Sequence, residues 1–299
     1  MMEYHNPVLL NESIDALIGD PNGVYVDCTF GGGGHSREIL NRLSENGKLF
    51  SFDQDEDARE NTIQDERFEL VMQNFRFLKN NLRYRGVKTV DGILADLGVS
   101  SHQFDTPQRG FSTRFDGDLD MRMNQSQKLT AAEILNEYEE AQLADVFYNY
   151  GELRSARRMA REVVSERKNQ PFETIEQLKQ LFSYIPKNKE NKVLAQLFQS
   201  LRIEVNDEMS ALRELLLQCG ELIAPGGSLV VISYHSLEDR LVKRYMKTGM
   251  FEGEPEKDVF GNWDAPFAPT HSKVIVPTEV EIERNPRARS AKMRIAIKN

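Results

Sequence analysis

Short apolar runs alternate with amphipathic stretches along the first hundred residues of the chain. Four runs have the length and composition of buried strands, at 24–30, 48–53, 68–73 and 90–98. Between them, segments such as "HSREILNRLSEN" and "FRFLKNNLRYRG" carry apolar residues at helical spacing. Strands that alternate with helices predict a parallel sheet with helical crossovers, which is an α/β fold.

The middle of the chain has a different pattern, because only helices are indicated there. Residues 105–131 contain no convincing strand, and residues 131–222 have helical spacing, ending in a long helix near 192–222 that "APGG" terminates. The strand pattern resumes only at 228–235. A connection of that length without structure of its own is uncommon in a compact domain. We therefore expect an all-helical domain inserted into the α/β domain.

These patterns set the boundaries of the two expected domains. The α/β domain takes residues 1–108 and 206–299, and the inserted domain takes residues 109–205. Near the end of the chain, residues 252–271 are rich in glycine, proline and acids and are expected to form a loop. "SKVIVPTEVEIE" and "SAKMRIAIK" are expected to form the last strands.

Four consecutive glycines follow the first strand, in "VYVDCTFGGGGHS". Glycine adopts positive φ and lets a ligand approach the main chain. Open parallel sheets bind ligands at the carboxyl ends of their strands, so this loop is the expected ligand site. Asp53 ends the second strand 20 residues after Gly33, and an acid at that place typically binds ribose hydroxyls. Together these features predict a cofactor that contains adenosine.

The spacing of the glycines argues against a dinucleotide cofactor. The GxGxxG pattern needs a third glycine where this chain has Ser36 or Arg37. Asp27, Gly31 and Gly33 instead resemble motif I of the class I S-adenosylmethionine (SAM) methyltransferases. SAM has no pyrophosphate, and its methionine end needs close approach of the backbone and an acid for its ammonium group.

The composition narrows the class of protein. The chain has no apolar run long enough to span a membrane, and its first residues do not resemble a signal or transit peptide. Its two cysteines, Cys28 and Cys219, are far apart, which argues against a disulfide framework and fits a reducing cytoplasm. No group of His, Cys and Asp has the spacing of metal ligands, so no metal is expected.

The net charge of −9 counts against nucleic-acid binding, but two local clusters are basic. Arg154, Arg157, Arg158 and Arg161 fall on one face of an expected helix. Residues 284–299 contain six Lys or Arg and no acid. Each cluster is either a solvated surface or a surface that contacts phosphates.

Six ordered blocks of sequence resemble signatures of one family. The resemblance is to the bacterial ribosomal RNA small-subunit methyltransferase H family, also called MraW, and with "HNPVLLNE" it spans nearly the whole chain. The blocks are "DCTFGGGGHS", "DGILADLGVSS", "RGFS…DGDLDMRM", "LAQLFQSLRIEVNDE", "LIAPGGSLVVISYHSLEDRLVK" and "ERNPRARSAKMRIA".

The resemblance implies a class I SAM-methyltransferase fold, a Rossmann-like parallel sheet, with SAM as the cofactor. It implies methyl transfer to the exocyclic N4 of a cytidine in the decoding region, at the P-site, of 16S rRNA in the small ribosomal subunit. It leaves the oligomeric state open between monomer and homodimer. Methylation at C5 would need a cysteine thiolate, and neither cysteine falls at an expected acceptor position.

The resemblance also implies which residues form the site. Its SAM-binding pattern matches, in residue type, Gly33, Gly34, His35, Asp53, Phe75, Asp96 and Gln103. Phe75 would flank the adenine. Asp96, at the end of the fourth strand, is the candidate catalytic residue, as a hydrogen-bond acceptor for N4. The chain has "DLGV" at this place, so the Asp/Asn/Ser-Pro-Pro-aromatic motif of many amino-group methyltransferases does not support the role.

Other residues are candidates for the acceptor side of the site. Tyr234 and His235, in "SYHSLEDR", would line it, and Phe104, Phe111 and Phe115 are candidates to stack on the unstacked base. Ser236 and Asp239 have the spacing of a helix capping box. Arg157 and Arg161 would hold RNA backbone.

Two other functions compete with this interpretation. The chain could be a SAM-dependent methyltransferase with another acceptor, or a SAM-binding ribosome-assembly protein without catalytic activity. A nicotinamide-dependent oxidoreductase is a third alternative, which the missing third glycine disfavours.

Overall fold

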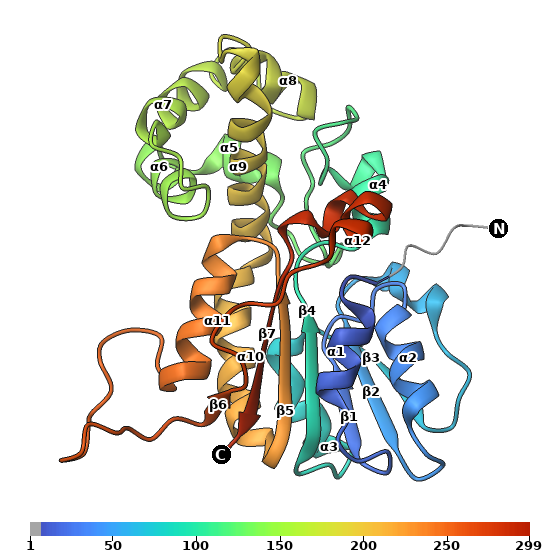
Figure 1. Ribbon diagram of the computed structural model, residues 1–299. Helices are drawn as coiled ribbons and strands as arrows, with labels where there is room; N and C mark the ends of the chain where they lie inside the picture. The colour runs from blue at the N-terminus through green and yellow to red at the C-terminus, as the bar shows by residue number, and fades with distance from the viewer. Residues whose placement is uncertain (1–6) are drawn as a thin grey trace. The chain divides into compact units, whose positions relative to one another are not determined.

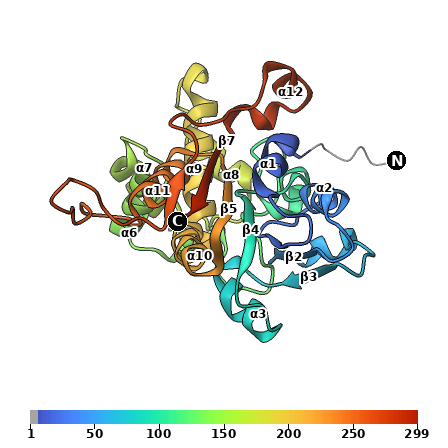
Figure 2. The ribbon, with the colours of Figure 1, turned by 60° about the horizontal axis from the view of Figure 1, so that its bottom comes forward.

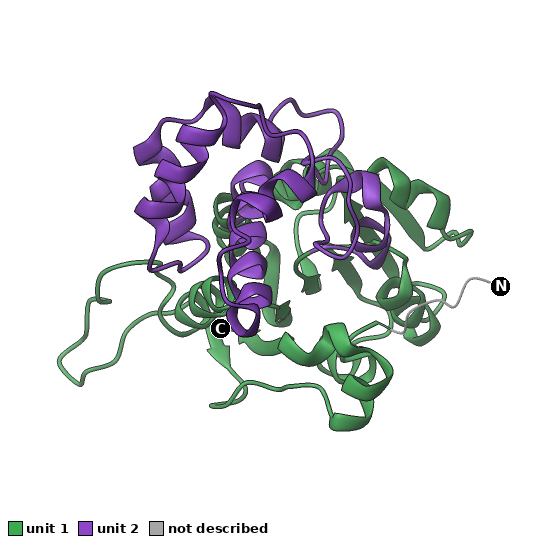
Figure 3. Ribbon diagram, turned by 90° about the horizontal axis from the view of Figure 1, so that it is seen from above, with its two compact units in different colours: residues 1–98, 209–299 green, residues 99–208 purple. Residues whose placement is uncertain are grey.

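The computed structural model describes residues 7–299 and divides the chain into two compact units. Unit 1 comprises residues 1–98 and 209–299, and unit 2 comprises residues 99–208 (Figure 3). Unit 2 begins at residue 99. The sequence pattern had placed the start of the inserted domain later, at residue 109. The reason is that Val99 and Phe104 pack against the core of unit 2.

Unit 1 contains a seven-stranded sheet with the strand order β3-β2-β1-β4-β5-β7-β6 (Figures 1 and 2). The pairs from β3 to β5 are parallel, whereas β7 runs antiparallel to both β5 and β6. The predicted α/β fold with a Rossmann-like parallel sheet is confirmed. The strands are β1 Val24–Asp27, β2 Lys48–Asp53, β3 Phe68–Met72, β4 Val90–Asp96, β5 Ile223–Ser233, β6 Phe267–Pro269 and β7 Lys292–Lys298.

Helices cover both faces of this sheet. Successive residues of each strand point to opposite faces, so they belong to two different buried clusters. Tyr25 and Leu94 belong to one buried cluster, which includes residues of α1 and α2. Val26 and Ile93 belong to the other, with residues of α3, α10 and α11. The helices of unit 1 are α1 Leu10–Leu17, α2 Gly34–Arg42, α3 Leu78–Tyr84, α10 Glu208–Leu222, α11 Ser236–Thr248 and α12 Glu279–Arg284, with 3₁₀ turns η1 Glu56–Asn61, η2 Phe75–Phe77 and η4 Pro286–Ser290.

Unit 2 is built from helices around its own apolar core, as predicted for the insertion. Phe147, Leu197 and Leu201 are among the fully buried side chains of this core. Thr130 and Thr174 begin two of its helices as capping boxes, each accepting a hydrogen bond from a backbone N–H. The elements are α4 Ser101–Asp105, η3 Pro107–Arg109, α5 Ala131–Glu137, α6 Glu140–Asn149, α7 Ala156–Glu166, α8 Ile175–Leu181 and α9 Lys187–Asn206.

The long helix expected near 192–222 is two helices, so that prediction was wrong. Asp207 has φ 48° and ψ 42°, a left-handed conformation that ends α9, and α10 begins at the next residue. Aspartate is among the few residues other than glycine that adopt this conformation readily. The apolar spacing is similar on both sides of Asp207, so periodicity alone did not reveal the break.

Three other expectations near the C-terminus also need correction. β5 begins at Ile223, and the "APGG" residues form an irregularity opposite Val90 and Gly92. Residues 279–284 form helix α12, because the Thr278 side chain accepts a hydrogen bond from the Glu281 N–H and starts a helix. The expected loop at 252–271 contains the short strand β6.

No helix within residues 7–299 is long and apolar enough to cross a membrane.

Candidate active site

Several polar residues lie at the carboxyl ends of neighbouring strands in unit 1. Asp27 ends β1, Asp53 ends β2 and Asp96 ends β4. Tyr234 directly follows β5. The strand order reverses between β1 and β4, where open α/β sheets form a crevice for ligands. The sheet topology therefore brings these four residues to one edge.

The glycine loop connects β1 to α2 at this edge. Gly31 and Gly33 have φ of 50° and 74°, which favours glycine. A Cβ at Gly34 would lie 2.2 Å from Cγ of Pro7, so this position is closed to any larger residue. A Cβ at Gly32 would have no atom within 4 Å, so the backbone there is open to a ligand.

Asp27 is buried and accepts hydrogen bonds from a hydroxyl group and a backbone N–H. The Ser36 hydroxyl donates to its Oδ2 at 2.6 Å, and the Thr29 N–H donates to its Oδ1 at 3.1 Å. Ser36 is also 2.8 Å from the hydroxyl of Ser51 on β2. This network ties the first turn of α2 to β1 and β2. Asp27 therefore acts as a structural anchor of the loop.

Asp53 binds the loop from the neighbouring strand. Its Oδ2 accepts a hydrogen bond from the Gly31 N–H at 2.7 Å, and its Oδ1 accepts one from the Asp55 N–H at 2.9 Å. Burial raises the pKa of Asp53 to about 6, although these two hydrogen bonds oppose the rise. Asp53 is thus a partly exposed carboxyl group of raised pKa at the place expected for a ribose contact.

Some neighbours of Asp96 lower its pKa and others raise it. The Tyr234 hydroxyl donates to its Oδ1 at 2.8 Å, and Nδ1 of His35 lies 3.9 Å from its Oδ2. Burial raises the pKa of Asp96 to about 6. His35 and the Tyr234 hydrogen bond oppose this rise, whereas Asp27 and Glu238 add to it. Tyr234, which the sequence placed on the acceptor side, therefore orients Asp96.

His35 belongs to the first turn of α2 and is nearly fully buried. Its Nε2 is 3.1 Å from the carbonyl oxygen of Val8. The N-terminal segment, defined here as residues 7–9, thus packs against the glycine loop and α2. The Leu9 N–H donates to Oε1 of Glu281 in α12 at 2.7 Å, which holds this segment from the other side.

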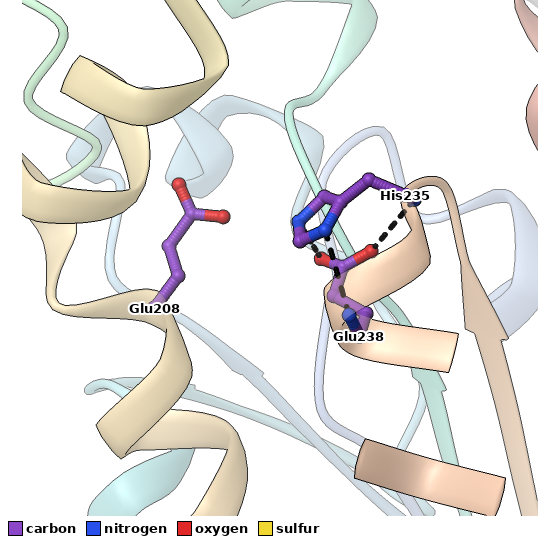
Figure 4. Close-up of side chains that lie close together, drawn as sticks. All are labelled: Glu208, His235 and Glu238. Atoms are coloured by element: carbon purple, nitrogen blue, oxygen red, sulfur yellow. Dashed lines mark hydrogen bonds and ion pairs between the residues drawn. The ribbon is translucent and has the colours of Figure 1, made fainter. Parts of the chain in front are cut away.

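His235 and Glu238 form the capping box of α11, so the predicted box of Ser236 and Asp239 was wrong. Glu238 Oε2 accepts a hydrogen bond from the Tyr234 N–H. It also accepts one from the His235 N–H, and the Glu238 N–H donates to His235 Nδ1 at 3.4 Å (Figure 4). His235 Nε2 is 3.2 Å from Glu238 Oε1. Both side chains are buried, so this box fixes the turn that carries Tyr234.

The remaining expected contacts lie on different elements. Phe75 begins η2 after β3 and is half-buried against the core of unit 1. Gln103 lies in unit 2, where its side chain accepts a hydrogen bond from the Ser100 N–H and caps α4. Phe111 is buried in the core of unit 2, which contradicts a stacking role for it. Phe115 is exposed.

Arg157 and Arg161 are exposed on α7 of unit 2. Arg161 lies 3.6 Å from Glu140 on α6, whereas Arg158 pairs with Glu162 at 2.8 Å and covers the ring of Tyr184. Arg154 precedes α7, so the arginine face is shorter than the spacing predicted. The helix begins at Ala156 because its buried face, including Met159 and Val163, starts there.

Sequence reasoning missed two parts of this site. The first is the N-terminal segment with its partners His35 and Glu281, although "HNPVLLNE" stood out as a block. The second is the hydrogen bond of Tyr234 to Asp96, which joins residues 138 positions apart. No local pattern could reveal either contact.

Together, an open glycine loop and two carboxyl groups of raised pKa can bind an adenosine and receive a proton.

Comparisons with known proteins show the family to which the chain belongs. Residues 2–299 match the model of the MraW methylase family. The chain is 60% identical to ribosomal RNA small subunit methyltransferase H of Christiangramia forsetii over 299 residues, which cover 100% of this chain and 99% of the relative. Identity to the protein of the same name from Flavobacterium johnsoniae is also 60%, covering 99% and 98%.

Among solved structures, one similarity is to Aeropyrum pernix fibrillarin in complex with SAM. It has a TM-score of 0.40 and 10% identity, and covers 96% of this chain and 74% of that chain.

Proposed function

The chain belongs to the MraW methylase family, and on that premise we propose that it methylates the exocyclic N4 of a cytidine in the decoding region of 16S rRNA. It is a SAM-dependent methyltransferase of small-subunit ribosomal RNA. The position of Asp96 is the observation that supports an amino group as the methyl acceptor. This carboxyl group is held by Tyr234 at the end of β4 and has a raised pKa, beside the glycine loop.

The residues of unit 1 fit SAM. The backbone at Gly32 is open, and the loop continues through Gly33 and Gly34 into the N-terminus of α2, whose free N–H groups suit a carboxylate. Asp53 would bind the ribose hydroxyls, and Phe75 would flank the adenine. Gln103 stays a contact predicted from the sequence pattern. When bound, SAM supplies a methyl group already activated by its sulfonium.

Asp96 would act on the substrate amine. The lone pair of a cytosine N4 is delocalised into the ring, so the amine is a weak nucleophile. A carboxylate that accepts a hydrogen from N4 favours the pyramidal form and stabilises the charge that develops on nitrogen. The N4 nitrogen forms its bond to the methyl carbon as the bond between that carbon and sulfur breaks, with the electron pair left on sulfur. Asp96 takes the proton that N4 releases.

Unit 2 would bind the RNA substrate. A base in folded RNA must leave its stack before its amine can react, and contacts to the backbone hold the RNA while it does so. The exposed arginines of α7, Arg157 and Arg161, supply positive charge for such contacts. His235 lies on the same turn as Tyr234 and is proposed to contact the acceptor nucleotide.

Methyl transfer from labelled SAM tests this function. Small ribosomal subunits that lack the modification are incubated with the protein, and the RNA is digested to nucleosides and separated. We expect label in N4-methylcytidine, lost in Asp53→Ala and kept in Glu60→Ala, a change of an exposed acid on nearby η1. Label in another nucleoside would overturn the N4 assignment. Absence of label from RNA, with SAM binding intact, would favour a different acceptor or a non-catalytic role.

A further inference from the structure

A threonine in the glycine loop holds the backbone of Asp96. The Asp96 N–H donates a hydrogen bond to Oγ1 of Thr29 at 2.8 Å. The ladder between β1 and β4 extends only as far as Cys28, whose N–H donates to the Leu94 carbonyl at 2.8 Å. Beyond this point the chain enters the loop, so the Thr29 hydroxyl takes the place of a ladder partner for Asp96.

Thr29 is in turn held by the buried Asp27. The Thr29 N–H donates to Oδ1 of Asp27 at 3.1 Å, and the Thr29 hydroxyl, which can donate and accept at once, donates to the same oxygen at 3.4 Å. Oδ2 of Asp27 accepts from the Ser36 hydroxyl in the first turn of α2 at 2.6 Å. A continuous chain of hydrogen bonds therefore runs from α2 through Asp27 and Thr29 to the backbone of Asp96.

Asp96 is thus held at two points, from the two strands beside β4. Thr29, after β1, accepts a hydrogen bond from its N–H, and Tyr234, after β5, donates one to its Oδ1 at 2.8 Å. β1 and β5 are the neighbours of β4 in the sheet. Tyr234 fixes the carboxyl group, whereas Thr29 fixes the main chain that carries it relative to the glycine loop.

We propose that Thr29 is a positioning residue for methyl transfer, whose hydroxyl holds Asp96 where its carboxyl group meets the substrate amine beside the cofactor. This inference rests on the proposed function. The methyl donor would lie against the glycine loop and the amine against Asp96, so the alignment of nitrogen, methyl carbon and sulfur depends on how these two parts are joined. A misplacement of about 1 Å can lower a reaction rate about 100-fold.

The hydroxyl is the part of the Thr29 side chain that can have this role, because the methyl group offers no acceptor. Thr29→Val keeps the branched shape and removes the acceptor for the Asp96 N–H. Thr29→Ala also removes it, and Thr29→Ser keeps it. The hydrogen bond from the N–H of residue 29 to Asp27 uses only the main chain, so the loop retains this anchor in all three variants.

Steady-state kinetics test this role, with N4-methylcytidine formed in small ribosomal subunits as the measured product. In Thr29→Val and Thr29→Ala, we expect kcat to fall at least about tenfold while KM for SAM stays within about twofold of the wild type. Thr29→Ser should restore most of kcat. The matched control is Thr62→Val, which removes an exposed hydroxyl that donates to the Arg59 carbonyl and should leave kcat unchanged.

An unchanged kcat in Thr29→Val would overturn the proposal. Equal losses in Thr29→Val and Thr29→Ser, or a rise in KM for SAM that accompanies the loss of kcat, would also overturn it, since disruption of the loop has that effect. A second measurement needs no RNA: hydrogen exchange of the Asp96 amide should be faster in Thr29→Val than in the wild type and Thr29→Ser, and equal exchange would contradict the proposal. Because this experiment needs no substrate, failure of the proposed function and failure of the role of Thr29 are distinguishable.

Discussion

At the scale of single residues, the site contains carboxyl groups that weaken the fold. Burial raises the pKa of both Asp53 and Asp96 to about 6. The folded chain therefore binds their protons more tightly than the unfolded chain, in which the pKa of aspartate is about 3.9. Between these two values, the free energy of unfolding falls as pH rises, and above pH 6 the full penalty is present. Ionisable groups at functional sites commonly have shifted pKa values and a stability cost of this kind.

Asp96→Asn should therefore stabilise the protein while it abolishes methylation. Asparagine keeps an acceptor for Tyr234 and removes the partly buried charge. At pH 8 we expect the free energy of unfolding to rise by about 1–3 kcal/mol, and the gain to disappear near pH 4. Urea unfolding at both pH values measures this.

Substitution of a second aspartate, Asp65, should change the stability in the opposite direction, so it serves as the control. Arg67 lowers the pKa of Asp65 to about 2 through a paired contact. Asp65→Asn should reduce stability at pH 8, with the loss vanishing as pH falls through 4 to 2. If Asp96→Asn destabilised the protein at pH 8 as Asp65→Asn does, burial would not be the dominant influence on Asp96.

At the scale of elements, the glycine loop between β1 and α2 packs against the N-terminal segment. Gly31 and Gly33 supply the positive φ that the turn needs, while Gly34 allows Pro7 to approach. Gly32 has neither constraint. The four glycines thus have different roles, which substitutions can separate.

Gly34→Ala should reduce stability, whereas Gly32→Ala should weaken ligand binding and leave stability unchanged. Alanine at 34 would gain up to about 1 kcal/mol in helix propensity, but its Cβ would lie 2.2 Å from Pro7. Because such overpacking costs about 1–3 kcal/mol, we expect a lower melting temperature. Gly32→Ala should melt like the wild type yet bind SAM more weakly by calorimetry, because a methyl group would occupy the open backbone. Unchanged SAM affinity in Gly32→Ala would place the cofactor elsewhere.

At the scale of the whole molecule, the proposed function assigns the methyl transfer to unit 1 and RNA binding to unit 2. Unit 1 contains the sheet and the carboxyl groups, and unit 2 contains the exposed arginines of α7. The overall charge of −9 opposes RNA binding at long range, so recognition has to rest on local positive surfaces.

Arg157→Glu/Arg161→Glu should reduce methylation of ribosomal subunits while SAM affinity stays unchanged. Two reversed phosphate contacts should raise KM for the subunit at least tenfold and reduce its dependence on salt. The control is Arg83→Glu/Lys88→Glu, which reverses the same charge at exposed positions near α3 of unit 1. Equal losses in both double variants would indicate a general effect of charge and would remove α7 from the account of RNA binding.

Sequence periodicity located most elements, because it depends on neighbouring residues. The strands β1 to β4 end within a few residues of their expected positions, and the inserted helices were predicted from spacing alone. Errors arose where a single residue overrides periodicity. Asp207 breaks a helix by its backbone conformation, and Thr278 starts a helix in a segment that alternates like a strand.

The sequence by itself determined the α/β class, the helical insertion, the glycine loop and the family resemblance. Each depends on residue types at short spacing or in ordered blocks. Only the tertiary structure decided that Tyr234 holds Asp96, that Val8 fixes His35 and that Glu281 holds Leu9. The last of these contacts joins residues 272 positions apart. Contacts of this kind depend on how strands and helices pack, and local spacing contains no information about the partner of a buried polar group.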